Sequence, residues 1–94
     1  MPTPDEFASL NARSQKALID FLEVELALGD TFLDTARIES KFDEDHCQRA
    51  FEKAQEALDS VRYFQGRVSD RTQWAAIQTR ADRLEAALKA FRGW

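Results

Sequence analysis

The chain has 94 residues, of which 44% are hydrophobic and 32% are charged, and its formal net charge at pH 7 is −4. A chain of this length buries only about 60 to 68% of its unfolded surface, so a large cofactor cavity would consume the interior that the core needs. These numbers exclude a large enzyme fold and leave room for one compact core. We therefore expect a single helical domain over residues 1–94.

Helix-breaking residues are scarce in this chain. It contains three glycines and two prolines, and both prolines fall within the first four residues. Alanine and leucine together number 23, against 11 for valine, isoleucine and threonine, which favours helix over sheet. The composition predicts an all-α protein.

The cysteine count and the distribution of apolar residues indicate the cellular compartment of the protein. Cys47 is the one cysteine and can form no internal disulfide, which is typical of a reducing compartment. No apolar run approaches the roughly 18 residues that span a bilayer, and the first residues lack the basic and apolar regions of a signal peptide. We expect a cytoplasmic protein that does not bind membranes.

The first expected helix covers residues 4–38. Thr3, Pro4 and Glu6 match an N-cap hydroxyl, a proline at the first helical position and an acid that bonds back to the cap. Apolar residues then recur at steps of three and four and form one broad stripe. The members of this stripe are Phe7, Leu10, Ala17, Leu18, Phe21, Leu22, Leu26, Leu28, Phe32, Leu33 and Ala36.

Two features could interrupt this first helix. Ser14, after Asn11, could cap a new helix and leave a short extra N-terminal helix before it. Gly29 weakens a helix by roughly 1 kcal/mol relative to alanine. The apolar pattern continues on both sides of Gly29, so we expect the helix to pass through it and another helix to approach closely there.

Two more helices are expected, over residues 43–65 and 70–92. Three acidic residues at 43–45 suit a helix N-terminus, and Gly66 suits a left-handed cap at the end of the second helix. Ser69 or Asp70 starts the third helix. Its apolar positions follow a heptad seam that consists of Trp74, Ile77, Ala81, Leu84, Leu88 and Phe91.

Three helices joined by short connections predict an antiparallel up-down-up three-helix bundle with long helices. At 1.5 Å per residue, the second and third helices would be about 33 Å long and the first up to ~50 Å. The first helix is therefore too long for its neighbours. Either it breaks near residues 11–14, or its tip with Phe7 and Leu10 projects and needs a partner.

Two segments resemble the tetratricopeptide repeat (TPR). Leu28 and Gly29 are followed by Phe32, and residues 50–58 place spaced alanines around an aromatic. In outline the chain is also similar to the three-helix microtubule-interacting and trafficking module, and to small uncharacterised helical proteins of bacteria. The two named families imply a module that binds peptides or helices of other proteins, and neither implies catalysis.

The segment 43–47 contains the residue types that bind metals. His46 lies beside Asp43, Asp45 and Cys47, which could hold a transition ion weakly. A small regulatory or metal-responsive protein that uses this segment is therefore an alternative function. The simpler interpretation is that the acids stabilise a helix N-terminus and Cys47 belongs to the core, so we assign no metal ligand.

The best candidates for catalytic residues in the sequence are pairs of carboxylates. Asp30 with Asp34, or Glu23 with Glu25, could serve as acid and base. No oxyanion donors or glycine-rich phosphate loop accompany them. We expect no catalytic residue, no cofactor and no enzymatic activity.

Most of the ten aromatic residues follow the core spacing. Those expected in the core are Phe21, Phe32, Phe51, Trp74 and Phe91. Phe7, Phe42, Tyr63 and Trp94 fit this spacing less well. Their exposure would mark a partner surface, because a small monomer rarely exposes contiguous apolar patches.

Charge is distributed unevenly along the chain. Residues 1–39 carry three basic and eight acidic groups, a net charge of −5, whereas residues 66–94 carry six and three, a net charge of +3. The first and third helices can pair with each other, or a basic partner can dock on the first helix. Acidic residues interleave with the arginines of the third helix, which argues against nucleic acid as a partner.

The sequence as a whole predicts a non-enzymatic protein–protein interaction or scaffold module. Its partner would be another protein or a second copy of the chain, as in a homodimer, held by burial of a helix against the first helix. The candidate partner surface consists of Phe7, Leu10, Asp20, Glu23, Asp30 and Asp34.

Overall fold

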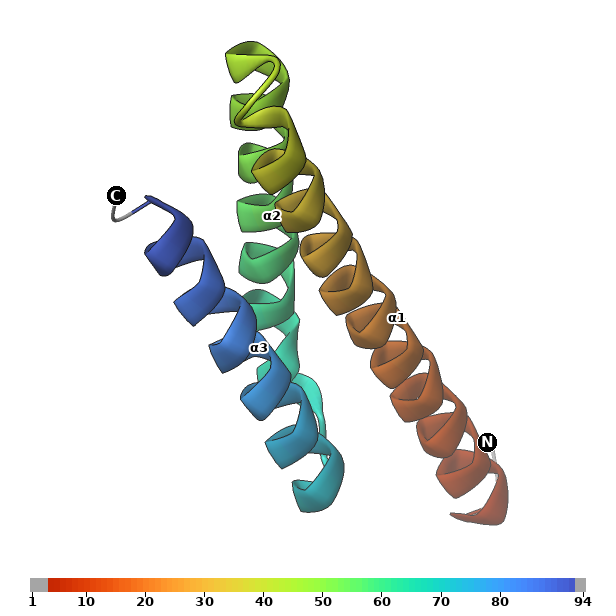
Figure 1. The fold of residues 1–94 in the computed structure, drawn as a ribbon. Helices are drawn as coiled ribbons and strands as arrows, with labels where there is room; N and C mark the ends of the chain where they lie inside the picture. Colours follow the sequence, from red (N-terminus) through yellow and green to blue (C-terminus); the bar gives the residue numbers. More distant parts are fainter. Residues whose placement is uncertain (1–3, 93–94) are drawn as a thin grey trace.

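The computed structural model describes the backbone of residues 4–92 and the side chains of residues 13–92. It contains three α-helices, α1 (Pro4–Glu39), α2 (Glu44–Phe64) and α3 (Arg71–Arg92), with a 3₁₀ turn, η1 (Gln65–Arg67), after α2. The chain runs up α1, down α2 and up α3 (Figure 1), and residues 4–92 contain no strand. The predicted all-α, up-down-up three-helix arrangement is confirmed.

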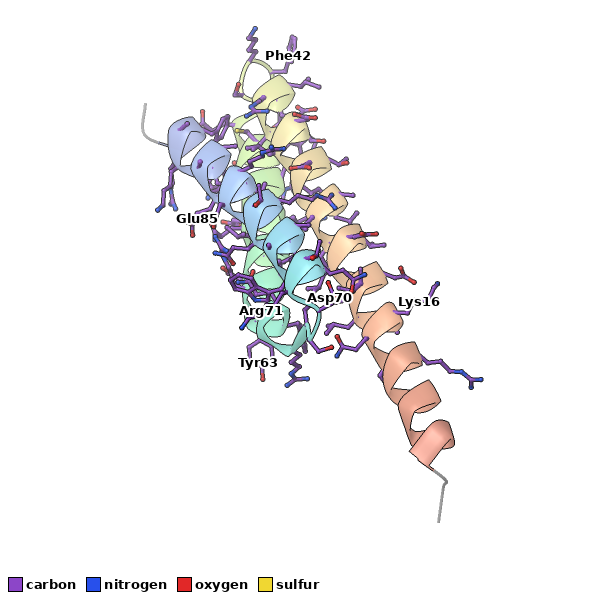
Figure 2. All side chains as sticks on the ribbon, turned by 90° about the horizontal axis from the view of Figure 1, so that it is seen from below. Lys16, Phe42, Tyr63, Asp70, Arg71 and Glu85 are labelled. Atoms are coloured by element: carbon purple, nitrogen blue, oxygen red, sulfur yellow. The ribbon has the colours of Figure 1, made fainter. Side chains whose placement is uncertain are left out.

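The first helix is continuous over 36 residues. It passes through residues 11–14 and through Gly29 without a break, so the alternative of a short extra N-terminal helix is wrong. At 1.5 Å per residue α1 is about 20 Å longer than α2 or α3. Its N-terminal part runs on past η1 in both views (Figures 1 and 2). The side chains of Phe7 and Leu10 lie outside those that the structure describes.

Acidic side chains define where α2 and α3 begin. Asp43 accepts a hydrogen bond from the His46 backbone N–H at 3.1 Å. Asp70 accepts one from the Gln73 backbone N–H at 2.8 Å. Both are N-caps of the usual kind, with a side-chain oxygen bound to an unpaired amide of the first turn. The expected starts of both helices follow from this local chemistry.

The end of α2 differs from the expectation. Gly66 does not adopt a left-handed conformation, and no residue within 4–92 has a positive φ. Instead α2 tightens into η1, where the Val68 N–H donates to the Gln65 carbonyl at 3.1 Å. A 3₁₀ turn satisfies the last carbonyls without a glycine cap, so the predicted cap at Gly66 is wrong.

The core is formed by apolar side chains from all three helices and by Val68, which follows η1. α1 packs most extensively against α2. The buried members are Ile19, Leu22, Leu26, Leu33, Ala36, Ala50, Phe51, Ala54, Ala57, Leu58, Val61, Val68, Ile77, Ala81, Leu84 and Leu88.

At Gly29 the three helices approach one another closely. A Cβ placed on Gly29 would lie 2.5 Å from Leu84 Cδ2 of α3 and 3.6 Å from Ala57 Cβ of α2. The absence of a side chain therefore lets α3 close onto α1, as the sequence predicted.

Two aromatic residues expected in the core are partly exposed. Phe51 is buried, and Phe32 and Phe91 are half-buried against the core. Phe21 and Trp74, however, are 41% and 39% exposed, which corrects the prediction. Phe21 lies outside the face that α1 buries, with its ring edge-to-face on Phe64, and Trp74 lies in the first turn of α3, at the end of the bundle.

The α2–α3 pair is joined by a polar cluster around Arg62. Its guanidinium donates to Asp82 at 2.8 Å and to Gln78 at 3.3 Å, and it lies 3.5 Å from a Glu85 oxygen. The Arg62 side chain is 26% exposed. These contacts link one residue of α2 to one face of α3 over two of its turns.

Over the part of the chain that the structure describes, none of the helices combines the length and the apolar composition needed to cross a lipid bilayer.

Candidate interaction surface

A second apolar seam runs along α1 on the side away from the core. Four of its side chains are exposed: Phe21 (41%), Val24 (57%), Leu28 (40%) and Ile38 (61%). Thr31 and Thr35, also exposed, lie between them. The six positions are separated by steps of three, four, three, four and three residues. We call this set, Phe21, Val24, Leu28, Thr31, Thr35 and Ile38, the outer seam.

The face that α1 buries has the same spacing. We call it the core seam, and it consists of Ile19, Leu22, Leu26, Gly29, Leu33 and Ala36. At 100° per residue, the centres of the two seams are about 160° apart around the helix. One apolar face of α1 therefore packs on α2 and α3, and another lies on nearly the opposite side of the helix.

Sequence reasoning missed this division. It merged Phe21 and Leu28 with the core residues in one broad stripe and left out Ile19, which is buried, and Val24, which is exposed. Sorting the apolar residues of α1 by heptad position separates the two seams, so the sequence did contain the information.

A groove lies along the α2 side of the outer seam. It has a volume of about 340 Å³ and is lined by Thr31, Phe32, Thr35, Glu39, His46, Arg49, Ala50 and Lys53. Lys53 Nζ lies 5.5 Å from the centroid of the Phe32 ring, a cation–π contact. Toward the other end of the seam, the Phe21 ring packs edge-to-face on Phe64 at 5.5 Å. The outer seam is thus bordered by basic side chains at one end and by aromatic rings at the other.

The predicted acidic surface residues lie along the other edge of α1. Asp20, Glu23, Asp30 and Asp34 are all exposed. Their positions fall within about 80° of one another around the helix, between the core seam and the outer seam on the α3 side. We call these four residues the acidic edge. The structure therefore brings four of the six predicted partner-surface residues to one edge, and Phe7 and Leu10 remain outside the described side chains.

The acidic edge does not form the expected ion pairs with α3. Asp20 lies 3.4 Å from Lys16, and Asp34 lies 3.0 Å from Arg37, both within α1. Among the side chains of residues 13–92, no ion pair joins α1 to α3. The acidic residues Asp82 and Glu85 of α3 instead form ion pairs with Arg62 of α2. A groove of about 420 Å³ separates the acidic edge from the facing arginines, and it is lined by Asp30, Leu33, Asp34, Arg37, Arg80, Arg83, Leu84 and Ala87.

Phe42 and Tyr63 are exposed, at 80% and 71%. Figure 2 shows Phe42 at the turn between α1 and α2 and Tyr63 near η1, at opposite ends of the bundle. These two rings therefore do not form one patch. Phe7 and Trp94 lie outside the described side chains.

The segment 43–47 does not come together as a metal centre. His46 Nδ1 lies 3.3 Å from Asp43 and 3.9 Å from Glu39, whereas Cys47 packs against the core. Within the described residues, no group of three or more histidine, cysteine or acidic side chains is arranged to hold a metal ion. No observation favours the metal-responsive alternative.

Two pKa shifts in this segment follow from its structural role. The backbone N–H of His46 lowers the pKa of Asp43, as expected for an N-cap carboxylate. Burial, followed by the charges of Glu44 and Glu39, raises the pKa of the Cys47 thiol. Cys47 is therefore held in its neutral form, which is the less reactive one.

No protein family, curated protein or solved structure matches this chain. The resemblance to the tetratricopeptide repeat and to three-helix trafficking modules stays a prediction, and the function must be argued from the surface itself.

Proposed function

We propose that this protein is a non-enzymatic interaction module that binds a partner helix along the outer seam of α1. The observation that carries this proposal is the spacing of the exposed apolar residues. From Phe21 to Ile38, four exposed apolar residues and two threonines keep a heptad pattern for about 26 Å of helix. Such a pattern is typical of a face on which another helix packs.

Burial supplies the affinity in this proposal. Val24 and Ile38 are more than half exposed, and complete burial of such a side chain is worth about 1.5 to 3 kcal/mol. Because roughly half of that surface is still in water, each would contribute about 1 kcal/mol on docking. Several such contacts are needed to offset the loss of free motion that binding costs.

Charge supplies the orientation. The acidic edge lies on one side of the outer seam, and Arg49 and Lys53 lie on the other. A docked helix therefore meets negative charge on its one side and positive charge on its other. Such an arrangement selects one of the two possible directions of a partner helix.

The test is site-specific photo-crosslinking in the cells that produce the protein. A photoreactive residue at Val24 or Ile38 should give covalent adducts, and the same residue at Thr72, which is exposed on α3, should not. Leu28→Asp, placed between the two seam positions, should abolish the adducts. If neither seam position gives an adduct, the proposed function is wrong.

We also place this module in a reducing compartment such as the cytoplasm, on the ground that Cys47 is a free cysteine. Fractionation of the cells with an antibody to the protein tests this location. Recovery from an oxidising compartment would contradict it.

A further inference from the structure

We propose that the helix that docks on the outer seam is α1 of a second copy of this chain, running antiparallel across a two-fold axis. This inference rests on the proposed function and deepens it by naming the partner. The axis passes between Leu28 and Thr31, at the middle of the outer seam. Both copies then use the same surface, as a closed two-fold dimer requires.

The outer seam matches itself in this direction. Its steps read the same from either end, so six positions of one copy face six positions of the other. Phe21 lies opposite Ile38 of the second copy, and Leu28 lies opposite Thr31 of the second copy. Every apolar side chain of the seam is covered, and each threonine faces an apolar side chain of the second copy, Thr31 facing Leu28 and Thr35 facing Val24.

The charges beside the seam fit the same arrangement. Lys53 lies over the Phe32 ring and has no ion-pair partner among the side chains of residues 13–92. Glu25 has the same heptad position as Phe32, one heptad earlier, so it lies on the same edge of α1 and is half-buried there. A two-fold axis keeps α2 on the same side in both copies. Lys53 of one copy therefore faces Glu25 of the second copy, and this contact occurs twice.

A parallel dimer would place like charges together. In that arrangement the α2 side of one α1 meets the α3 side of the other. Heptad geometry then sets Asp20 beside Glu25 and Asp34 beside Glu39 of the second copy, all of them acidic. The antiparallel arrangement instead sets Asp34 beside Ala27 of the second copy. The acidic edges of the two copies lie on the same side of the antiparallel dimer, so its direction rests on the two Lys53–Glu25 contacts.

Charge reversal with rescue tests this assignment. The purified full chain should be a dimer by light scattering after size exclusion. Glu25→Lys and Lys53→Glu should each weaken the dimer by about tenfold or more, since each acts at two equivalent contacts. The double variant restores the opposite charges and should return to within about threefold of the starting affinity.

Matched controls come from the outward face of α2 and the start of α3. Glu56→Lys and Arg71→Glu make the same changes of charge at exposed positions away from the seam, and they should leave the dimer unchanged. Circular dichroism should show that every variant is folded. A dimer that the double variant does not restore would overturn the assigned contact.

Disulfide trapping tests the register without relying on charge. In a Cys47→Ser background, Val24→Cys and Thr35→Cys are mixed, and a disulfide should form between the two variants because these positions face each other across the axis. Neither variant alone should crosslink, since its two copies lie about 16 Å apart along the helix. Crosslinking of Val24→Cys with itself would indicate a parallel dimer and overturn the proposal.

The outcomes separate this inference from the proposed function. A chain that stays monomeric at millimolar concentration, while Val24 crosslinks to a different protein in cells, overturns self-association and leaves helix docking in place. A monomer that gives no crosslink at either seam position overturns both.

Discussion

The core seam and the outer seam of α1 share one helix, one spacing and a similar apolar content, yet only the first is covered within the chain. The core seam contains Gly29 and Ala36, whose small size lets the other helices approach. The outer seam has larger residues at its ends and threonines toward its middle. Periodicity therefore indicates that a face is to be covered, whereas side-chain size indicates how closely the covering helix can come.

The largest effect should come from truncating the core seam. Leu26 is 1% exposed, and Leu26→Ala should lower the free energy of unfolding by about 3 kcal/mol, since it leaves a cavity. Leu28→Ala, on the outer seam, should cost less than about 1 kcal/mol in the monomer. Urea denaturation of both variants at low protein concentration measures the difference. Equal losses would remove the distinction between the seams.

The next effect concerns the close approach at Gly29. Gly29→Ala forces the buried Leu84 side chain to shift, which costs more than alanine gains in helix propensity, so we expect a loss of about 1 kcal/mol. Gly66→Ala is the matched control, because a Cβ there meets no atom within 4 Å. It should leave the Tm unchanged or raise it slightly. Thermal unfolding followed by circular dichroism compares the two.

A smaller loss of stability is expected from changing Asp43, which lies in the turn between α1 and α2. Asp43→Ala removes the cap of α2 and should lower the Tm at pH 7, whereas Asp45→Ala, also in the first turn, should do so less. The pKa of Asp43 is lowered in the folded chain below its ordinary value of 3.8. The stabilisation is therefore present above that value and is lost as the pH falls through the lowered pKa.

A titration of Tm against pH tests this sign. The Tm difference between the native chain and Asp43→Ala should be constant near neutral pH and should vanish in acid. A difference that grows on acidification would contradict the role of Asp43 as an ionised cap.

The smallest effect on folding should come from the outer seam itself. Val24→Asp combined with Ile38→Asp should change the monomer's free energy of unfolding by no more than about 0.5 kcal/mol, because both positions are more than half exposed. The same variant should lose all dimer signal in light scattering. A large loss of monomer stability would show that the outer seam supports the fold.

Local chemistry made the helix starts predictable from sequence. Asp43 and Asp70 cap helices through contacts three residues along the chain, and such contacts depend on nothing distant. The close approach at Gly29 was predictable too. A glycine weakens a helix, so its place within an unbroken apolar pattern indicates that a neighbouring helix needs the space.

The remaining features depend on how the helices meet. The exposure of Trp74 depends on where the bundle ends, which heptad position does not specify. The ion pairs of α3 depend on which helix presents a basic side chain at the correct level, and Arg62 does so from α2. The outer seam was visible in the sequence, but its exposure required a structure in which the core seam had already been assigned.

The contacts of Arg62 fix the position of α3 along its own axis. An apolar heptad seam looks alike after a shift of seven residues, so packing alone allows α3 to slip by two turns against its neighbours. Arg62 contacts Gln78, Asp82 and Glu85, which lie on one face of α3 over two turns. A slip by seven residues would put Ala75 or Lys89 in the place of Asp82, whose oxygen lies 2.8 Å from Arg62. This single side chain therefore sets the register of α3, while the apolar residues set the strength of its packing.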